Sequence, residues 1–198
     1  MRIYFVFFNF IFFHFQAAII PILLGIRSIN KFKHISNNKL IPFGFIFLGL
    51  ASISEMIDHT QTSWIYVDHS SFFNWLFYSF LSLGLTFLSI SVVKNKFIQK
   101  TNFFISLCAI FSYFLFDKTI SLLFQAIISI FLIRNWQHIF KDWLLILYPI
   151  FGIFLTTFFG TNLSISGDQF WHVLIGPSGT ISILTFYLVL KKSCKKFT

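Results

Sequence analysis

The chain has 198 residues, of which 57% are hydrophobic and 11% are charged, and its formal net charge is +9. Water-soluble domains carry about 25% charged residues, so this composition excludes a soluble globular protein. The basic residues lie in short segments between apolar runs and form no single patch, which excludes a nucleic-acid-binding surface. Two cysteines, Cys108 in an apolar run and Cys194 in a lysine-rich tail, provide neither a disulfide framework nor a thiolate zinc site.

Apolar runs predict seven membrane-spanning helices. The first run continues to about Gly25, which is longer than the about 7–15 apolar residues of a secretory signal peptide. A spanning helix needs about 17–25 residues, and the predicted spans are 3–25, 41–57, 70–93, 102–116, 119–133, 143–160 and 169–190. The fourth and fifth runs are short, so a re-entrant hairpin is the alternative to two spans there. The sequence therefore predicts an all-α, integral, multi-pass membrane protein with one domain over residues 1–198.

The distribution of basic residues predicts the orientation of this bundle. Lysine and arginine accumulate in cytoplasmic loops, and here 13 of the 15 basic residues fall on one side of the seven-span arrangement. They lie in the segments 26–40, 94–101 and 134–141 and in the C-terminal tail. We therefore expect the N-terminus outside the cytoplasm and the C-terminus inside.

Acidic residues and histidines gather on the opposite side. Of the six carboxylates, five fall there, namely Glu55, Asp58, Asp68, Asp117 and Asp168. Three of the six histidines accompany them, namely His59, His69 and His172. The second span ends in SISEMIDHT, the third opens at YVDHSS, and the seventh opens at GDQFWHVLIG. Three helix ends on one membrane face therefore combine carboxylates with imidazoles.

The spacing of these residues predicts which of them lie on the same helix face. Glu55 and His59 are four residues apart, as are Asp168 and His172, so each pair is predicted to share one helix face. Ser52 lies on the stripe of Glu55, one turn earlier. Ionisable groups at membrane depth usually face the bundle interior, where they are paired or bind an ion. Nitrogen and oxygen ligands from separate helices are suited to a tetrahedral Zn²⁺ site.

Helix capping and contact with interfacial water are the alternative explanation for these residues. Asp58 and Asp68 suit that role, whereas Glu55 and His172 lie deepest in their spans and fit it least. His14, in the first span, is expected to be a polar residue that faces the bundle rather than a ligand.

These motifs resemble the CREST superfamily of seven-helix membrane proteins, which includes alkaline ceramidases, progestin and adipoQ receptors, and hemolysin III-like proteins. Members have a Ser and a His one turn apart at the end of the second helix, an Asp opening the third, and an HxxxH pair opening the seventh. Here VDHSS, with Asp68, is similar to the third-helix motif, and DQFWHVLIG carries His172 on the second His of the pair. The sequence departs from the pattern at Asp168, where the family has its first seventh-helix His, and at Glu55, where it has Ser.

The resemblance implies a zinc-dependent hydrolase that acts on a lipid amide or ester at the non-cytoplasmic face. His59 and His172 would be zinc ligands, and Asp168 would replace the missing His. Asp68 would orient or deprotonate the attacking water.

Three further residues would complete such a site. Ser52 or Ser54 would contact the developing oxyanion, and Glu55 would serve as a general base or a fourth ligand. A fourth protein ligand would close the site and make it structural rather than catalytic.

Two other functions remain open from the sequence. The first is a non-catalytic membrane protein, either receptor-like or an assembly factor, in which the acidic and histidine cluster is structural. The second is a transporter or proton relay, which the first, fourth and fifth spans disfavour because they carry no line of ionisable groups. Membrane lipids are the partners that all these readings share, and nucleic acid is not expected.

Overall fold

The computed structural model describes residues 2–61, 71–116 and 118–194 and contains only helices within these ranges. The elements are α1 (Arg2–Ser28), α2 (Leu40–Gln61), α3 (Phe72–Ser91), α4 (Lys96–Leu115), α5 (Lys118–Phe140), η1 (Trp143–Ile146), η2 (Tyr148–Leu155), α6 (Thr156–Ser166) and α7 (Gln169–Cys194). The predicted all-α fold class is confirmed for this part of the chain.

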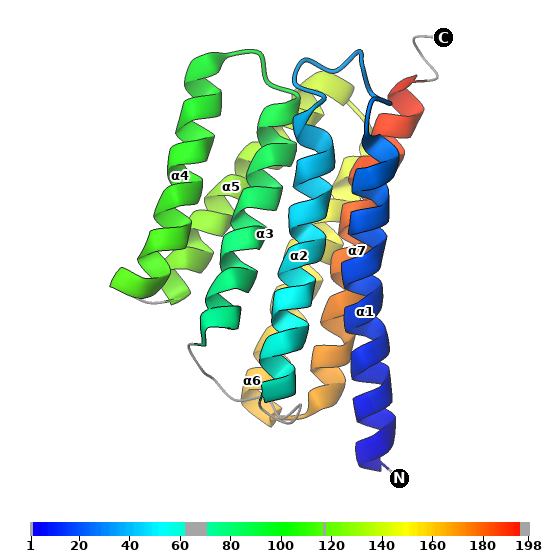
Figure 1. The fold of residues 1–198 in the computed structure, drawn as a ribbon, viewed down its shortest axis with the longest axis vertical. Helices are drawn as coiled ribbons and strands as arrows, with labels where there is room; N and C mark the ends of the chain where they lie inside the picture. Colours follow the sequence, from blue (N-terminus) through cyan, green and yellow to red (C-terminus); the bar gives the residue numbers. More distant parts are fainter. Residues whose placement is uncertain (1, 62–70, 117, 195–198) are drawn as a thin grey trace.

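The helices form one elongated bundle, with the N-terminus and the C-terminus at opposite ends (Figure 1). This placement is required of a chain that crosses an odd number of times. α2 packs between α1 and α3, α1 also packs against α7, and the α4–α5 hairpin packs against α3. η1, η2 and α6 connect α5 to α7 and close the bundle on the remaining side.

Six helical segments among the described residues are long and apolar enough to cross a membrane. α1, with 27 residues, is also long enough to cross. α4 and α5 are both longer than the apolar runs at 102–116 and 119–133. The reason is that polar residues continue each helix beyond its apolar run, from Lys96 in α4 and to Phe140 in α5. Two full spans therefore describe this region better than a re-entrant hairpin does.

The sixth crossing is a composite helix. The Asp142 side chain accepts a hydrogen bond from the Leu144 backbone N–H at 3.1 Å and starts the 3₁₀ turn η1. Pro149 lies near the start of η2, which is π-helical. Because proline lacks an N–H, it cannot complete the regular α-helical ladder, and π-helical stretches are rare and frequent at functional sites. Gly167, with φ of 64°, ends α6 in the left-handed conformation that glycine adopts without strain.

A close approach of backbones sets the spacing between α1 and α2. A Cβ atom at Gly49 of α2 would lie 2.6 Å from the Ala18 carbonyl oxygen and 2.5 Å from Ile22 Cγ1 of α1. Small residues allow this contact, which supplies much of the packing energy between membrane helices. Deeper in the bundle, the buried Trp136 of α5 donates its indole N–H to the Leu88 carbonyl oxygen of α3 at 2.8 Å.

The Gly49 contact makes a testable prediction. Gly49→Ala should destabilise the protein by about 1–3 kcal/mol, since overpacking at a tight contact forces the backbone to move. Thermal unfolding in detergent measures the effect. Gly160→Ala is the matched control, because a Cβ there meets nothing within 4 Å. Equal unfolding temperatures for the two variants would contradict the importance of this contact.

Candidate metal centre

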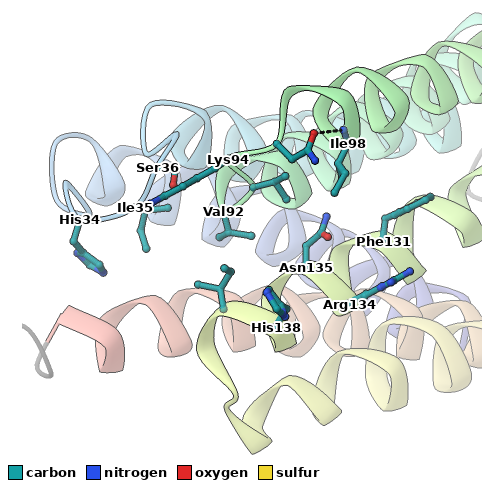
Figure 2. A pocket seen from close by; sticks show the side chains of 13 residues that line it. His34, Ile35, Ser36, Val92, Lys94, Ile98, Phe131, Arg134, Asn135 and His138 are labelled. Carbon is teal, nitrogen blue, oxygen red and sulfur yellow. Dashed lines mark hydrogen bonds between the residues drawn. The ribbon is translucent and has the colours of Figure 1, made fainter.

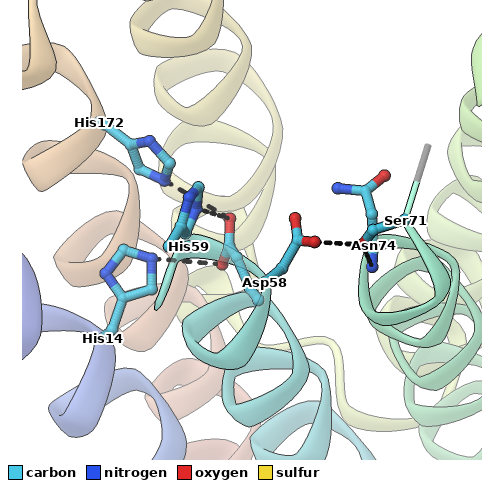
Figure 3. Close-up of polar contacts among 7 residues, drawn as sticks. His14, Asp58, His59, Ser71, Asn74 and His172 are labelled. Atoms are coloured by element: carbon cyan, nitrogen blue, oxygen red, sulfur yellow. Dashed lines mark hydrogen bonds and ion pairs between the residues drawn. The ribbon is translucent and has the colours of Figure 1, made fainter. Parts of the chain in front are cut away.

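Four ionisable side chains from three helices converge inside the bundle. Glu55 and His59 are one turn apart on α2 and share one face, as their spacing predicted. His14 comes from α1 and His172 from the first turns of α7. Figure 3 shows His14, His59 and His172 around one carboxylate, and the dashed lines mark their ion pairs, which join each histidine to Glu55.

The distances define a compact cluster around that carboxylate. His172 Nε2 lies 3.5 Å from Glu55 Oε1, His14 Nε2 lies 3.6 Å from Glu55 Oε2, and His59 Nε2 lies 3.9 Å from Glu55 Oε1. One candidate ligand atom from each of the four residues lies within 4.8 Å of all the others. We call His14, Glu55, His59 and His172 the histidine cluster.

The packing of α1 against α7 brings two of these histidines together. A Cβ atom at Gly176, one turn after His172, would lie 3.2 Å from the Phe13 carbonyl oxygen, so the α1 backbone approaches α7 closely beside His14. The ring centroids of His14 and His172 are 5.3 Å apart as a result. The His59 ring lies 4.6 Å from that of His172.

The cluster is shielded from solvent. The three histidines are between 4% and 6% exposed, and the side chain of Glu55 is 22% exposed. Burying ionisable groups is costly unless they are paired or bind an ion. In a membrane-spanning bundle such a group is a functional-site hypothesis.

The spacing of the donor atoms fits a metal ion. Four ligands at about 2.0–2.1 Å from a tetrahedral Zn²⁺ stand about 3.3 Å from one another. The nitrogen–oxygen distances of 3.5–3.9 Å are slightly longer than that value, and all four candidate ligand atoms lie within 4.8 Å of one another. The nitrogen–oxygen distances exceed the about 2.7–2.9 Å of a charge-assisted N–H···O hydrogen bond. Three imidazole nitrogens and one carboxylate oxygen are also donors that zinc accepts.

A cavity of about 680 Å³ extends from the histidine cluster into the bundle. His14, Glu55 and His172 form part of its wall, and side chains of α2, α3, α5, η2, α6 and α7 form the rest. Cavities that hold small molecules usually measure about 300–1,000 Å³ and are mainly apolar with a few polar groups. This cavity has both properties.

The polar groups of the cavity wall are ordered by hydrogen bonds. The hydroxyls of Tyr148 and Ser129 lie 2.9 Å apart. The Gln125 side-chain amide donates to the Ser82 hydroxyl and to the Tyr78 carbonyl oxygen, both at 3.1 Å. These interactions join η2, α5 and α3, so the cavity has a fixed polar wall away from the histidine cluster.

The structure brings together some of the residues predicted from the sequence and separates others. His59, His172 and Glu55 meet, and Ser52 lies one turn from Glu55 on the cavity wall. Ser54 instead donates its hydroxyl to the Leu50 carbonyl oxygen of its own helix at 3.0 Å.

Asp168 does not reach the histidine cluster. It is exposed, and its carboxylate accepts a hydrogen bond from the Phe170 backbone N–H at 3.0 Å, as an N-cap residue of α7 does. Because α7 begins at Gln169, the four-residue spacing to His172 does not place the two side chains on one helical face. Asp68, the predicted water-orienting residue, lies outside the described residues, as does His69.

The sequence interpretation gives Asp58 a role in helix capping or in contact with interfacial water, and the structure places it, buried, beside the N-cap residue of α3. It is 1% exposed and accepts a hydrogen bond from the Ser71 hydroxyl. Ser71 in turn caps α3 by accepting from the Asn74 backbone N–H at 3.0 Å. Tyr113 of α4 donates to the Asn74 side chain at 2.7 Å. Asp58 therefore connects α2 to the N-cap of α3 and points away from the histidine cluster (Figure 3).

His14 is the member of the cluster that the sequence interpretation did not select as a ligand. Its expected orientation toward the bundle interior agrees with its burial. The available signal was an ionisable residue in an apolar run, which marks a functional position in a membrane helix. The sequence does not show which helices α1 packs against, so the convergence with His59 and His172 required the structure.

The fold and the buried cluster define an integral, multi-pass membrane protein with a polar site inside its helical bundle. Comparison with protein families assigns it more closely. Residues 5–196 match the family 7TM_cyano, described as "Seven transmembrane receptor". The match covers nearly the whole chain, and the chain belongs to this family. The predicted membrane location is thereby confirmed. Searches of curated proteins and of solved structures each gave no significant match.

The position of Asp168 makes a second prediction. Asp168→Ala should remove the cap of α7 and cost about 0.5–2 kcal/mol of stability, while leaving the histidine cluster assembled. Thermal unfolding measures the first effect, and metal content per protein measures the second. A loss of bound metal equal to that of a cluster variant would show that Asp168 is a ligand after all.

Proposed function

We propose that this protein is a non-catalytic, receptor-like membrane protein that binds one zinc ion in its histidine cluster. The ion joins α1, α2 and α7 at one wall of the internal cavity, and the cavity receives the ligand. The observation that carries the proposal is the convergence of four donor atoms from three helices within 4.8 Å.

The number of donors favours a structural ion over a catalytic one. A catalytic zinc keeps three protein ligands and one open position, whereas a structural zinc has four protein ligands. His14, Glu55, His59 and His172 provide four. An ion held by all four would fix the relative positions of α1, α2 and α7 and would be bound only by the folded bundle.

Membership of the seven-transmembrane receptor family supports a binding function, and the cavity supplies a place for it. Its volume of about 680 Å³ suits a small molecule. Its wall presents the hydrogen-bonded groups of Gln125, Ser129 and Tyr148 on one side and Glu55 on another. A ligand with an apolar body and polar groups at both ends fits this arrangement.

The resemblance to the CREST superfamily adds support for zinc through two residues, His59 and His172. In that pattern the first His of the seventh-helix pair, which Asp168 replaces here, completes the ligand set. Here His14 of α1 is in a position to supply the third nitrogen, since Asp168 lies apart from the cluster. The zinc proposal therefore rests on a ligand set that the resemblance alone does not give.

Zinc content tests the proposal directly. Protein purified without chelators should hold about one zinc ion per chain. His14→Ala and His172→Ala should each weaken binding more than about 100-fold, because loss of a residue that merely supports a ligand already costs about 10–100-fold. Elemental analysis and competition with a chromogenic chelator measure both effects.

His138→Ala is the matched control, since this exposed histidine lies on α5 outside the cluster. Chelation should also lower the unfolding temperature of the wild type and leave that of His172→Ala unchanged, because an ion that binds only the folded state stabilises it. Absence of metal from the wild-type protein, together with no response to added zinc, would overturn the proposal.

One observation favours a second candidate, the zinc-dependent hydrolysis of a lipid amide or ester. Ser52 and Glu55 line the same cavity as His14 and His172. If three histidines alone held the ion, the Glu55 carboxylate would be available as a general base and Ser52 as a hydrogen-bond donor. Zinc, when bound, would polarise the carbonyl group of the substrate.

Turnover of labelled lipids separates the two candidates. The receptor-like proposal predicts no product from labelled ceramides or acyl esters incubated with the zinc-loaded protein, and a zinc content that falls in Glu55→Gln. The hydrolase predicts product formation that falls about 100-fold or more in Glu55→Gln, as expected for loss of a general base, with zinc content retained.

A further inference from the structure

A second cavity, of about 780 Å³, lies at the end of the bundle where the chain turns from α1 to α2 and from α3 to α4, the end that carries most of the basic residues. The loop between α1 and α2, the loop between α3 and α4, and the last turns of α5 surround it (Figure 2). None of these elements contributes to the histidine cluster. The cavity is therefore a separate site with its own chemistry.

The polar part of this cavity is basic. Lys94, Arg134 and His138 line it together with the amides of Asn95 and Asn135. His34 lies on another part of the wall, where its Nε2 is 3.1 Å from the Ser193 hydroxyl of α7. No described residue of the lining is acidic.

The carboxylate that the sequence places at this end is neutralised elsewhere. Asp142 forms an ion pair with Lys192, with 2.8 Å between Oδ2 and Nζ, and its side chain is 6% exposed. Lys94 and Arg134 are exposed side chains of a cavity whose described lining contains no carboxylate, and a basic lining favours an anion within the cavity. Arg134, with a planar guanidinium, can bind two oxygens of one phosphate group.

The remaining wall is apolar. Ile35, Val92 and Val93 are buried at its base, and Ile98, Phe131 and Ile139 contribute side chains from α4 and α5. Phe131 and Ile139 lie on α5, a helix apolar enough to span a membrane and only one-third buried. An apolar chain could therefore pass from this cavity along α5 into the hydrocarbon.

We propose that this cavity binds the phosphate group of an anionic lipid, with Lys94 and Arg134 as its principal ligands and the apolar wall against the start of its acyl chains. Basic pockets between membrane helices on the cytoplasmic side bind such head groups. Our expected orientation places this end in the cytoplasm. The site is independent of the histidine cluster, so it stands or falls separately from the proposed zinc function.

Binding of short-chain lipids to the full-length protein in neutral detergent tests this inference. Dioctanoyl phosphatidylglycerol should bind at least about tenfold more tightly than dioctanoyl phosphatidylcholine, whose head group carries no net charge. Lys94→Gln and Arg134→Gln should each weaken phosphatidylglycerol binding about fivefold, as expected for one basic residue near an anionic lipid. Native mass spectrometry and thermal-shift titration measure the affinities.

Lys100→Gln is the matched control, because Lys100 is an exposed residue of α4 at the same end and does not line the cavity. Circular dichroism and size-exclusion chromatography verify that each variant is folded. Inorganic phosphate is the second probe: competition at concentrations similar to those of the lipid would identify a free phosphate compound as the ligand of the same residues. Equal binding of the two lipids, or equal losses in Lys100→Gln and Arg134→Gln, would overturn the site.

Discussion

The Glu55 carboxylate and the three imidazoles around it impose the strongest constraint on the structure. A lone ionised carboxylate inside a bundle that is surrounded by hydrocarbon would cost several kcal/mol in lost hydration. His14, His59 and His172 lie within 3.9 Å of its oxygens, and they come from three helices. Those helices can supply the three side chains only if their backbones approach closely. The absence of a Cβ at Gly49 and Gly176 permits that approach on both sides of α1. The packing of α1, α2 and α7 and the polar cluster are thus one arrangement rather than two.

This constraint also explains why a cavity begins where it does. The elements that hold the cluster are tightly packed, whereas the sixth crossing is not: only 11% of its apolar window is buried within the bundle. Its π-helical stretch at Tyr148–Leu155 widens the helix beside the cavity, and Tyr148 is held there by Ser129. Elements with few buried contacts open at the lowest free-energy cost. The sixth crossing is therefore the least buried of the six candidate spans, and the contact of Tyr148 with Ser129 joins it to α5.

The sequence predicted the fold class and the membrane location because the hydropathy of an apolar run indicates that its helix is surrounded by hydrocarbon rather than by water. It predicted the Glu55–His59 pair for a similar reason, since the spacing of residues within one continuous helix fixes their common face. The four-residue spacing did not apply to Asp168, because α7 starts at Gln169. The Asp168 carboxylate therefore caps the helix instead of sharing a face with His172. The sequence could not select His14, because a ligand set assembled from α1, α2 and α7 depends on which helices are neighbours, and no local spacing encodes that. Burial of Asp58 was missed for the same reason: its partner Ser71 belongs to another helix.

The positions of a few carboxylates make the two ends of the bundle differ in charge. The chain has six acidic side chains, and the position of each decides the charge of its surroundings. At one end Glu55 lies among imidazoles, where we propose that a cation binds. At the other end Asp142 forms an ion pair with Lys192. The neighbouring cavity is lined by Lys94 and Arg134, and no described residue of its lining is acidic. Moving a single carboxylate into that cavity would cancel much of its positive potential, since interactions near a membrane surface decay over roughly 8–10 Å. The placement of Glu55 and Asp142, rather than the total charge of the chain, therefore separates the proposed cation site from the proposed anion site within one small bundle.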